Sequence, residues 1–285
     1  MNIILAKTAG FCFGVKRAVE MTYKHQNMQN TYTFGPIIHN DTVINNLREN
    51  GISPIENLED EAINTLIIRS HGVIPKVYER AKEKGIQIVD ATCPYVKKIH
   101  RLVEEYFTKG YKIIIVGNKV HPEVEGINGW GHDECIIVKD AQELKTLKLP
   151  QLDTKYLLVA QTTYKKEVVE AAMRYLEDEG FDYKYSNTIC NATKERQEEA
   201  VEIAEQVECM LVIGSGYSSN TLKLYEICKV HCKESYCIAD ASELTSEMVK
   251  DKLNIGITAG ASTPATVIDE VIQKLLNKDL GEAKS

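Results

Sequence analysis

Three of the eight cysteines share a place in the sequence that suits metal chemistry, because each follows a predicted strand and comes directly before a predicted helix. Cys12 lies ahead of GVKRAVE, Cys93 ahead of PYVKKIHRLVEEYF and Cys190 ahead of NATKERQEEAVEIAEQ. The N-terminus of a helix carries about half a positive charge and lowers the pKa of a nearby thiol, so we expect three thiolates. Three thiolates that face one point require a cation.

The cysteine spacing favours one kind of cation without settling it. A zinc site would normally need a fourth Cys or His with close-set partners such as C-x2-C, which does not occur here. An iron–sulfur cube usually takes four cysteines, so three would leave one iron open to bind and activate a substrate. The spacing alone leaves the alternative that the cysteines are small buried hydrophobic residues.

Other cysteines, in CKVHCKESYC (228–237), surround a histidine and look like a metal motif. Steps of three and four residues, however, separate Leu222, Tyr225, Cys228 and Cys232, and this spacing predicts a helix face packed on the core. We therefore expect packing rather than metal ligation in this segment. The same interpretation applies to Cys135 and Cys209, which begin apolar strands.

The cysteines need strands and helices to position them, and the sequence alternates between the two. Apolar runs rich in β-branched residues, such as YKIIIVG, KYLLVAQ, CMLVIG and NIGITAG, predict buried strands. The amphipathic stretches between them predict helices. This alternation indicates an α/β fold with mainly parallel sheets.

The ends of the predicted strands repeat in three sets. In FGPIIHN, VGNKVHPE and IGSGYSSN a strand ends at a glycine, and a polar residue follows four positions later. IIRSHG, LVAQTT and GITAGASTP end in histidine or small polar residues, whereas IQIVDATCP, FDYKYSNTIC and NIILAKTAGFC end in cysteine. Functional groups collect beyond the carboxyl ends of parallel strands. Such residues also follow strands in other α/β proteins, but three sets in register favour a shared central cavity.

The repeat predicts three pseudo-equivalent α/β units around that cavity. The cysteines are about 80 to 100 residues apart, roughly the length of one small domain. We expect the first unit at 14–93, the second at 94–189 and the third at 190–281. The third unit is completed by residues 1–13, because its last strand is expected near the N-terminus.

Composition excludes some partners. The chain has 285 residues, 44% of them hydrophobic, a net charge of −7 and no long Lys/Arg block, which argues against nucleic acid as the main partner. The opening apolar run is too short for a signal peptide or a membrane span. We expect a cytoplasmic protein, in whose reducing compartment disulfides are rare.

Taken together, the motifs resemble those of a known enzyme family. The segments are FCFGV (11–15), SHG (70–72), DATCP (90–94), HPEVEG (121–126), QTT (161–163), TIC (188–190), SSNT (218–221) and GASTP (260–264). In this order they resemble the 4-hydroxy-3-methylbut-2-enyl diphosphate reductases of the non-mevalonate isoprenoid pathway, over residues 2 to 275. One turn departs from the family, since GSGY (214–217) stands where two glycines, a basic residue and asparagine are common.

The resemblance implies a cofactor, a substrate and a reaction. Cys12, Cys93 and Cys190 would hold a 4Fe-4S cluster with an open iron, and a ferredoxin or flavodoxin would supply electrons. The allylic hydroxyl of the substrate would be removed with two electrons and protons, giving isopentenyl and dimethylallyl diphosphate. The diphosphate would be bound by His39, His71, His121, Ser218, Ser219, Asn220 and Ser262, with Glu123 and Thr162 near the reacting hydroxyl.

The residue types fit this chemistry. Hydroxide is a poor leaving group, so its departure needs a Lewis acid and a proton supply, for which Glu123 is the candidate. Thr162 could hold the hydroxyl and pass a proton, since its side chain both donates and accepts. From the local sequence alone, Thr162 could instead cap the helix that begins near Lys165. Glu123, in the first turn of a helix, could merely complement the helix dipole.

Hydroxyl, amide and helix N-terminal donors at 218–220 make an anion site without lysine, and histidines add donors. His39, His71 and His121 lie at matching strand ends. The other four histidines, including His100, are expected on surfaces without a role.

Two other functions remain possible from the residues. A non-enzymatic iron–sulfur sensor would explain the cysteines but not the polar strand ends, and no basic face for DNA is evident. A cluster-dependent dehydratase would use the open iron without net reduction, and would turn over without a reductant.

Overall fold

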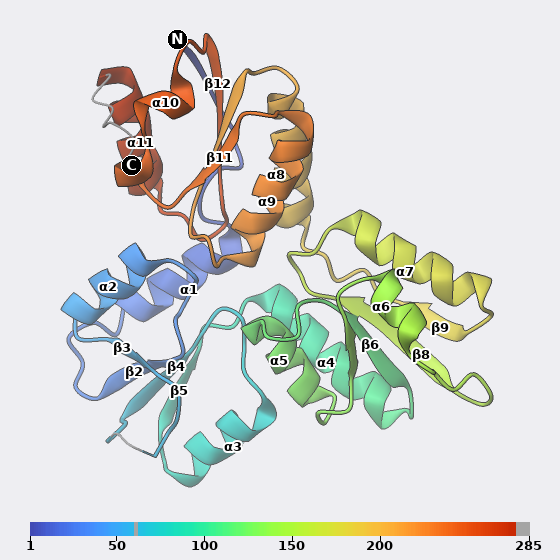
Figure 1. The fold of residues 1–285 in the computed structure, drawn as a ribbon. Coiled ribbons are helices and arrows are strands. Elements are labelled where there is room, and N and C mark those ends of the chain that lie inside the picture. Colours follow the sequence, from blue (N-terminus) through green and yellow to red (C-terminus); the bar gives the residue numbers. More distant parts are fainter. Residues whose placement is uncertain (60–61, 278–285) are drawn as a thin grey trace. The chain divides into compact units, whose positions relative to one another are not determined.

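The computed structural model describes residues 1–59 and 62–277. Figure 1 draws their helices and strands. Their contacts group into two compact units. The first unit contains residues 1–16, 39–43 and the chain from Asn191 onward, and the second contains residues 17–38 and 44–190. None of the described helices combines the length and apolar composition that a membrane span requires.

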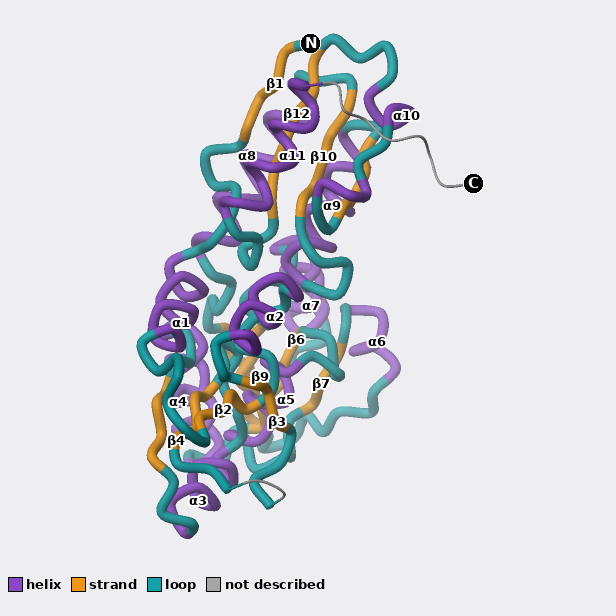
Figure 2. The backbone as a smooth tube through the Cα atoms, turned by 90° about the vertical axis from the view of Figure 1, so that its left-hand side faces the viewer, coloured by secondary structure: helices purple, strands orange, loops and turns teal. Residues whose placement is uncertain are grey.

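The first unit is built on one parallel sheet of four strands in the order β1-β12-β10-β11. Figure 2 shows β1, β12 and β10 running alongside one another. Asn2 of β1 pairs with Asn254 of β12, so the first strand of the chain completes a sheet made otherwise of its last strands. The bounds are β1 (Asn2–Leu5), β10 (Cys209–Ile213), β11 (Ser235–Ile238) and β12 (Asn254–Ala259).

Helices cover both faces of this sheet. One core cluster packs α11 against strand residues such as Leu211 and Ile257, and the other packs α8 and α9 against Met210 and Val212. Burial on both faces explains why these strands read as continuous apolar runs. The helices are α8 (Asn191–Ala204), α9 (Ser219–His231), α10 (Ser246–Val249) and α11 (Ala265–Asn277), with a 3-10 turn at Ala241–Glu243.

The second unit contains two parallel sheets of four strands, ordered β3-β2-β4-β5 and β7-β6-β8-β9. The strands of the first are β2 (Thr31–Phe34), β3 (Ser53–Ile55), β4 (Thr65–Ile68) and β5 (Gln87–Asp90). Those of the second are β6 (Lys112–Val116), β7 (Ile136–Val138), β8 (Lys155–Ala160) and β9 (Asp182–Tyr185).

Seven helices accompany these strands in the described residues. They are α1 (Phe13–Tyr23), α2 (Asp41–Glu49), α3 (Pro75–Glu83), α4 (Pro94–Thr108), α5 (Pro122–Trp130), α6 (Ala141–Thr146) and α7 (Lys166–Asp178). Proline opens α3, α4 and α5, where its fixed φ is favourable and its missing N–H costs nothing. The first residues of α1 and α2 are grouped with the first unit.

All three sheets have the same strand order when the first is read from β11 to β1 and β1 is counted after β12. The predicted α/β fold with parallel sheets is therefore confirmed. In each sheet the strand that leads to a cysteine, β1, β5 or β9, lies at an edge. Its neighbour is β12, β4 or β8, respectively. The fourth strand of each sheet is β3, β7 or β11, and of these the sequence predicted only β7, as the apolar strand beginning near Cys135. The boundaries 14–93, 94–189 and 190–281 and the central cavity stay predictions, and residues 278–281 lie outside the described residues.

A glycine follows the central strand β2, β6 or β10 in every sheet. The N–H of Gly35, Gly117 and Gly214 donates to the last carbonyl of the fourth strand, at 2.7, 2.9 and 2.9 Å. A Cβ on Gly214 would lie 2.7 Å from the hydroxyls of Thr221 and Thr263, and its φ of +145° is one that side chains rarely allow. The glycine therefore lets the chain turn tightly from the strand into the polar loop.

Candidate active site

Each of the three cysteines directly precedes a helix, as predicted, and each is held in the same way. The N–H of Cys12 donates to Ala261 O at 3.3 Å, that of Cys93 to Ser70 O at 2.9 Å and that of Cys190 to Thr162 O at 3.0 Å. Every acceptor lies in the loop after the strand next to the cysteine's own strand. The three half-buried cysteines therefore have equivalent backbone positions in their sheets.

The other cysteines are packing residues to different degrees. Burial raises the pKa of the Cys135, Cys209 and Cys228 thiols to about 12, which keeps them protonated. Cys228 and Cys232 are buried in the core between α9 and its sheet, so the expectation that this segment packs is confirmed. The predicted helix face is wrong at Leu222, which is exposed, while Leu224 is buried in its place.

Two charged side chains of helix α8 form hydrogen bonds with the loop that leads to Cys12. The buried guanidinium of Arg196 donates to the carbonyls of Thr8 and Gly10 in this loop and to Ala259 O at 2.8 Å. One turn later the carboxylate of Glu199 accepts from Lys7 N at 2.7 Å and from Thr8 N at 2.9 Å. Burial opposes its ionisation, but hydrogen bonds from Thr8 and Lys7 lower the pKa of Glu199. The cationic and anionic side chains thus fix both kinds of backbone group.

The loop before Cys93 is held by an arginine in a comparable way. Arg17 of α1 donates to Thr92 O at 3.2 Å and to Asp90 O at 3.5 Å. The Asp90 side chain accepts from Thr92 N at 3.0 Å and forms an ion pair with Lys97 at 2.6 Å. Arg17 and Arg196 each lie on a helix that begins right after a different cysteine, and each holds the loop of another.

Glu123 and Thr162 form the most tightly connected pair of the predicted site residues. Both lie in the second unit, at the start of α5 and in the loop after β8. Thr162 N donates to Glu123 Oε1 at 2.6 Å, and Thr162 Oγ1 donates to Glu123 Oε2 at 2.8 Å. Since α7 begins at Lys166 with Lys165 at its N-cap, Thr162 does not cap this helix.

The Glu123 carboxyl has an unusual acidity. Glu123 is only 2% exposed, and burial raises the pKa of its carboxyl to about 7. The hydrogen bonds from Thr162 act in the opposite direction, because they favour the ionised form. Near neutral pH this carboxyl is therefore divided between the protonated and ionised forms. A group of that kind can give up or take up a proton, as acid–base catalysis requires.

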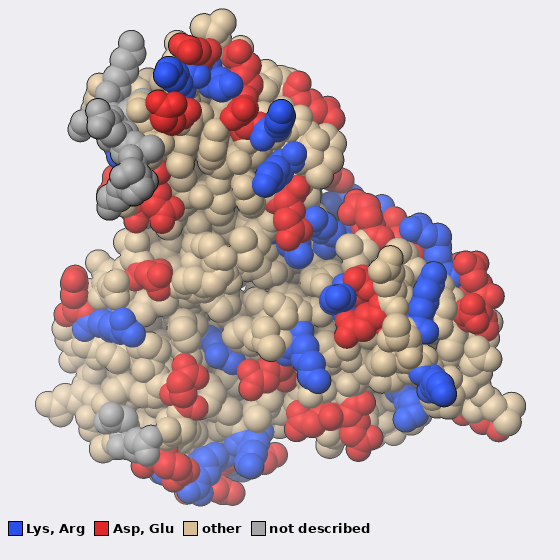
Figure 3. All heavy atoms as spheres, viewed as in Figure 1, with Lys and Arg blue, Asp and Glu red and all other residues tan. Residues whose placement is uncertain are grey.

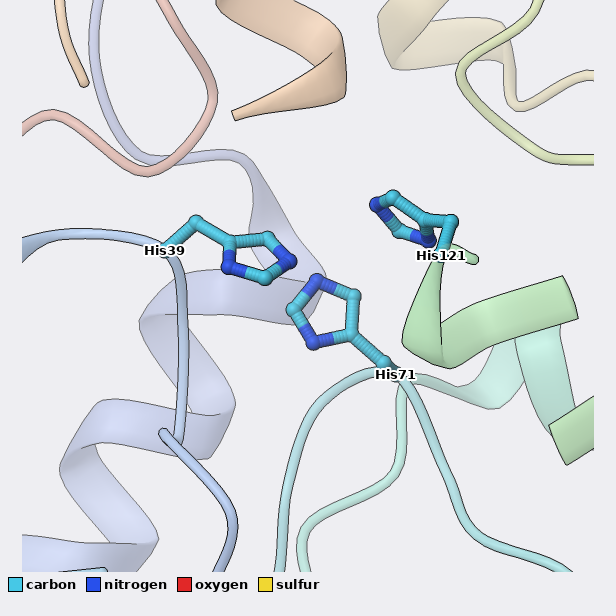
Figure 4. Close-up of side chains that lie close together, drawn as sticks. All are labelled: His39, His71 and His121. Atoms are coloured by element: carbon cyan, nitrogen blue, oxygen red, sulfur yellow. The ribbon is translucent and has the colours of Figure 1, made fainter. Parts of the chain in front are cut away.

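Two of the predicted histidines lie together in the second unit. Figure 4 shows the ring of His71, from the loop after β4, close to that of His121, from the start of α5. Their centroids are 5.4 Å apart and their planes are nearly perpendicular, at 83°. His121 is the N-cap of α5, where its Nδ1 accepts from Glu123 N at 3.2 Å. This leaves Nε2 as the donor of the neutral ring.

The remaining predicted residues lie in the first unit, around the N-terminus of α9. Ser218 is the N-cap of α9, and its hydroxyl lies 3.4 Å from that of Ser262. Ser262 Oγ donates to the backbone carbonyl of His39 at 3.1 Å. Asn220 Oδ1 accepts from Ala261 N at 2.9 Å, whereas its buried Nδ2 has no hydrogen-bond partner among the described residues. Ser219 is the first residue of α9.

His100 was expected on a surface, and that expectation is wrong. It is buried, stacks on Trp130 with ring centroids 5.4 Å apart, and burial lowers its pKa to about 4. A Cβ on Gly72 would lie 2.4 Å from His100 Cε1, so the neutral imidazole packs directly beneath the loop that carries His71. The signal was available, because His100 shares the apolar face of α4 with Val96 and Val103.

Three parallel sheets with polar, cysteine-bearing loops at their strand ends define an α/β protein of repeated units. A family model described as LytB protein matches residues 3–276, so the chain belongs to the LytB family. A protein of Caldanaerobacter subterraneus named 4-hydroxy-3-methylbut-2-enyl diphosphate reductase is 48% identical over 281 residues, 96% of either chain.

Solved structures are similar as well. One titled as (E)-4-hydroxy-3-methyl-but-2-enyl diphosphate reductase, the terminal enzyme of the non-mevalonate pathway, is 38% identical, with a TM-score of 0.70. It covers 97% of this chain and 100% of its own. The E-1-hydroxy-2-methyl-but-2-enyl-4-diphosphate reductase from Plasmodium falciparum is 31% identical with a TM-score of 0.89, covering 97% of this chain and 87% of its own.

Glu123 should make the stability of the protein fall as pH rises. The unfolded chain loses the proton near pH 4.5 and the folded chain only near 7. Between these values the unfolded state therefore binds fewer protons, which lowers the free energy of unfolding by about 3 kcal/mol. Urea unfolding at a series of pH values should show this fall in the wild type and not in Glu123→Gln. Glu125→Gln, at an exposed neighbour, serves as the control and should keep it; identical curves for all three proteins would contradict the assignment.

Arg196→Met should loosen the loop that carries Cys12. The substitution removes the donors to two buried carbonyls and one partly buried carbonyl, which should lower the free energy of unfolding by about 3 kcal/mol. Amide hydrogen exchange should accelerate at residues 7–12 more than in β10. Arg80→Met removes an exposed arginine that pairs with Glu59 and Glu83, and should change stability little. Equal effects at both positions would speak against a specific role for Arg196.

Proposed function

We propose that this protein is a 4-hydroxy-3-methylbut-2-enyl diphosphate reductase that converts its substrate to isopentenyl and dimethylallyl diphosphate. One observation supports the proposal above all: Thr162 links an acid–base group to a cysteine loop. Its N–H and hydroxyl donate to Glu123, and its carbonyl accepts from Cys190 N. A proton donor and a candidate cluster ligand are thereby joined through one residue, as a reductive removal of hydroxide needs. Family membership and the names of the relatives agree with this reaction.

The cysteines suit an iron–sulfur cluster, and we propose that Cys12, Cys93 and Cys190 hold one 4Fe-4S cluster. Thiolates are the usual ligands of such clusters, and these three residues have equivalent backbone settings at helix N-termini. When bound, the cluster supplies the electrons and a Lewis-acidic iron without a protein ligand. The buried, protonated thiols of Cys209 and Cys228 do not suit this role.

The protein's own groups handle the protons. Removal of the allylic hydroxyl consumes two electrons and two protons, one of which leaves with the hydroxyl as water while the other goes to the carbon chain. With a pKa of about 7, Glu123 holds a proton on part of the molecules at neutral pH and can deliver it. Thr162 Oγ1, 2.8 Å from Glu123 Oε2, can receive that proton while handing its own to the substrate hydroxyl.

The diphosphate is expected to meet uncharged donors. In the first unit the N-terminus of α9 offers Ser218, Ser219 and Asn220, whose buried Nδ2 lacks a partner among the described residues, together with Ser262. His39, His71 and His121 add ring N–H groups, and each imidazole can gain a proton when an anion binds.

Acidic and basic side chains are interspersed on the face drawn in Figure 3. We expect the electrons to come from a ferredoxin or a flavodoxin.

The cluster proposal predicts a division among the cysteines. Serine at any one of the three proposed ligands should abolish the 4Fe-4S absorption and lower the iron and sulfide content of protein reconstituted without oxygen. Cys228→Ser, in the packed core, is the matched control and should keep the full iron content. Iron retained by all three ligand variants, or lost by the control, would contradict the assignment.

Turnover should require both a one-electron reductant and Glu123. The loaded wild type should form the two five-carbon diphosphates only with reduced viologen, whereas a dehydratase would react without it. Glu123→Gln removes the proton but keeps the shape of the side chain, so we expect kcat to fall at least 100-fold, a typical contribution of acid–base catalysis. Its iron content and its affinity for substrate should stay near wild type. An unchanged kcat would remove Glu123 from the proton path.

A further inference from the structure

The turn between β10 and α9 places a tyrosine next to a predicted substrate ligand. Tyr217 immediately precedes Ser218, the N-cap of α9. Its side chain is 47% exposed and lies against residues 39–41, which belong to the same unit. Tyr217 is thus the only residue of GSGY that offers a large side chain to this segment.

Tyr217 makes two side-chain contacts with that segment. Its ring lies edge to face with the His39 ring, with centroids 5.5 Å apart and planes at 89°. Its hydroxyl donates to Asp41 Oδ1 at 2.6 Å, a short hydrogen bond to an ionised group. The first contact is with the imidazole itself, and the second ties the tyrosine ring to the Asp41 side chain.

The His39 main chain is held separately. Ser262 Oγ donates to His39 O at 3.1 Å, and Asn40 Oδ1 accepts from Val43 N at 3.0 Å. These hydrogen bonds hold the backbone of residues 39–43, whereas the Tyr217 ring contacts the imidazole itself. Freezing a side chain before the ligand arrives reduces the entropy that binding must otherwise spend.

We propose that Tyr217 is a positioning residue that holds the His39 imidazole ready for the substrate diphosphate. The inference rests on the proposed function, since it takes His39 to be a diphosphate ligand. Its ring packs on the imidazole while its bond to Asp41 keeps that ring from rotating into solvent. Loss of the ring should therefore harm binding more than loss of the hydroxyl alone.

Three variants test the proposal in cluster-loaded protein with inorganic pyrophosphate as the probe. Calorimetry should show Kd rising about tenfold for Tyr217→Ala and about threefold for Tyr217→Phe, which keeps the ring, differences of the size that single contacts give. Tyr236→Phe is the matched control: Tyr236 OH donates to Glu234 at 2.7 Å in the same unit, with no histidine contact described for it. It should bind like the wild type.

A second measurement distinguishes positioning from a general loss of structure. The NMR signal of the His39 ring, assigned by its absence in His39→Gln, should shift strongly in Tyr217→Ala and weakly in Tyr217→Phe, and stay in place in Tyr236→Phe. Wild-type affinity or an unmoved His39 signal in Tyr217→Ala would overturn the inference and leave the proposed function intact. Failure of the loaded wild type to bind pyrophosphate would overturn both.

Discussion

The backbone hydrogen bond between each cysteine and the loop of the neighbouring strand is the contact on which the candidate site depends. In a parallel sheet all strand carboxyl ends lie at one edge, so an edge strand and its neighbour release their loops side by side. The N–H of Cys190 reaches Thr162 O, and Thr162 in turn binds Glu123. The alignment of neighbouring strands therefore sets the positions of the cysteine, Thr162 and Glu123 relative to one another.

Charged side chains stabilise the loops that regular structure leaves open. Arg196 and Glu199 satisfy carbonyl and N–H groups of residues 7–10, and Arg17 does the same for carbonyls before Cys93. A buried guanidinium is costly to desolvate and is stable only where its donors are matched, which makes such a loop conformation specific. The neutral, buried His100 beneath the His71 loop achieves a similar end by packing. Rigid support of this kind suits a site that handles a small substrate.

Much of the fold follows from sequence, because apolar runs, turn glycines and helix starts are local signals. Strand ends at Gly35, Gly117 and Gly214 were predicted correctly for that reason. The short strands β3 and β11 lack such runs, and sequence reasoning missed them. The predicted buried face of α9 is wrong at Leu222, because residues spaced by three and by four positions can belong to either of two neighbouring faces of a helix. Side-chain bonds to distant backbone, such as those of Arg196, leave no periodic trace, so the sequence did not reveal them.

The pairing of β1 with β12 has a consequence for the order in which the sheet of the first unit can form. Asn2 lies opposite Asn254, so β1 has no partner in its sheet until β12, about 250 residues further along the chain, has been made. Both sheets of the second unit draw all their strands from the intervening chain and can form during synthesis. The loop between β1 and Cys12 can therefore take up its place in the sheet only after β12 has been made.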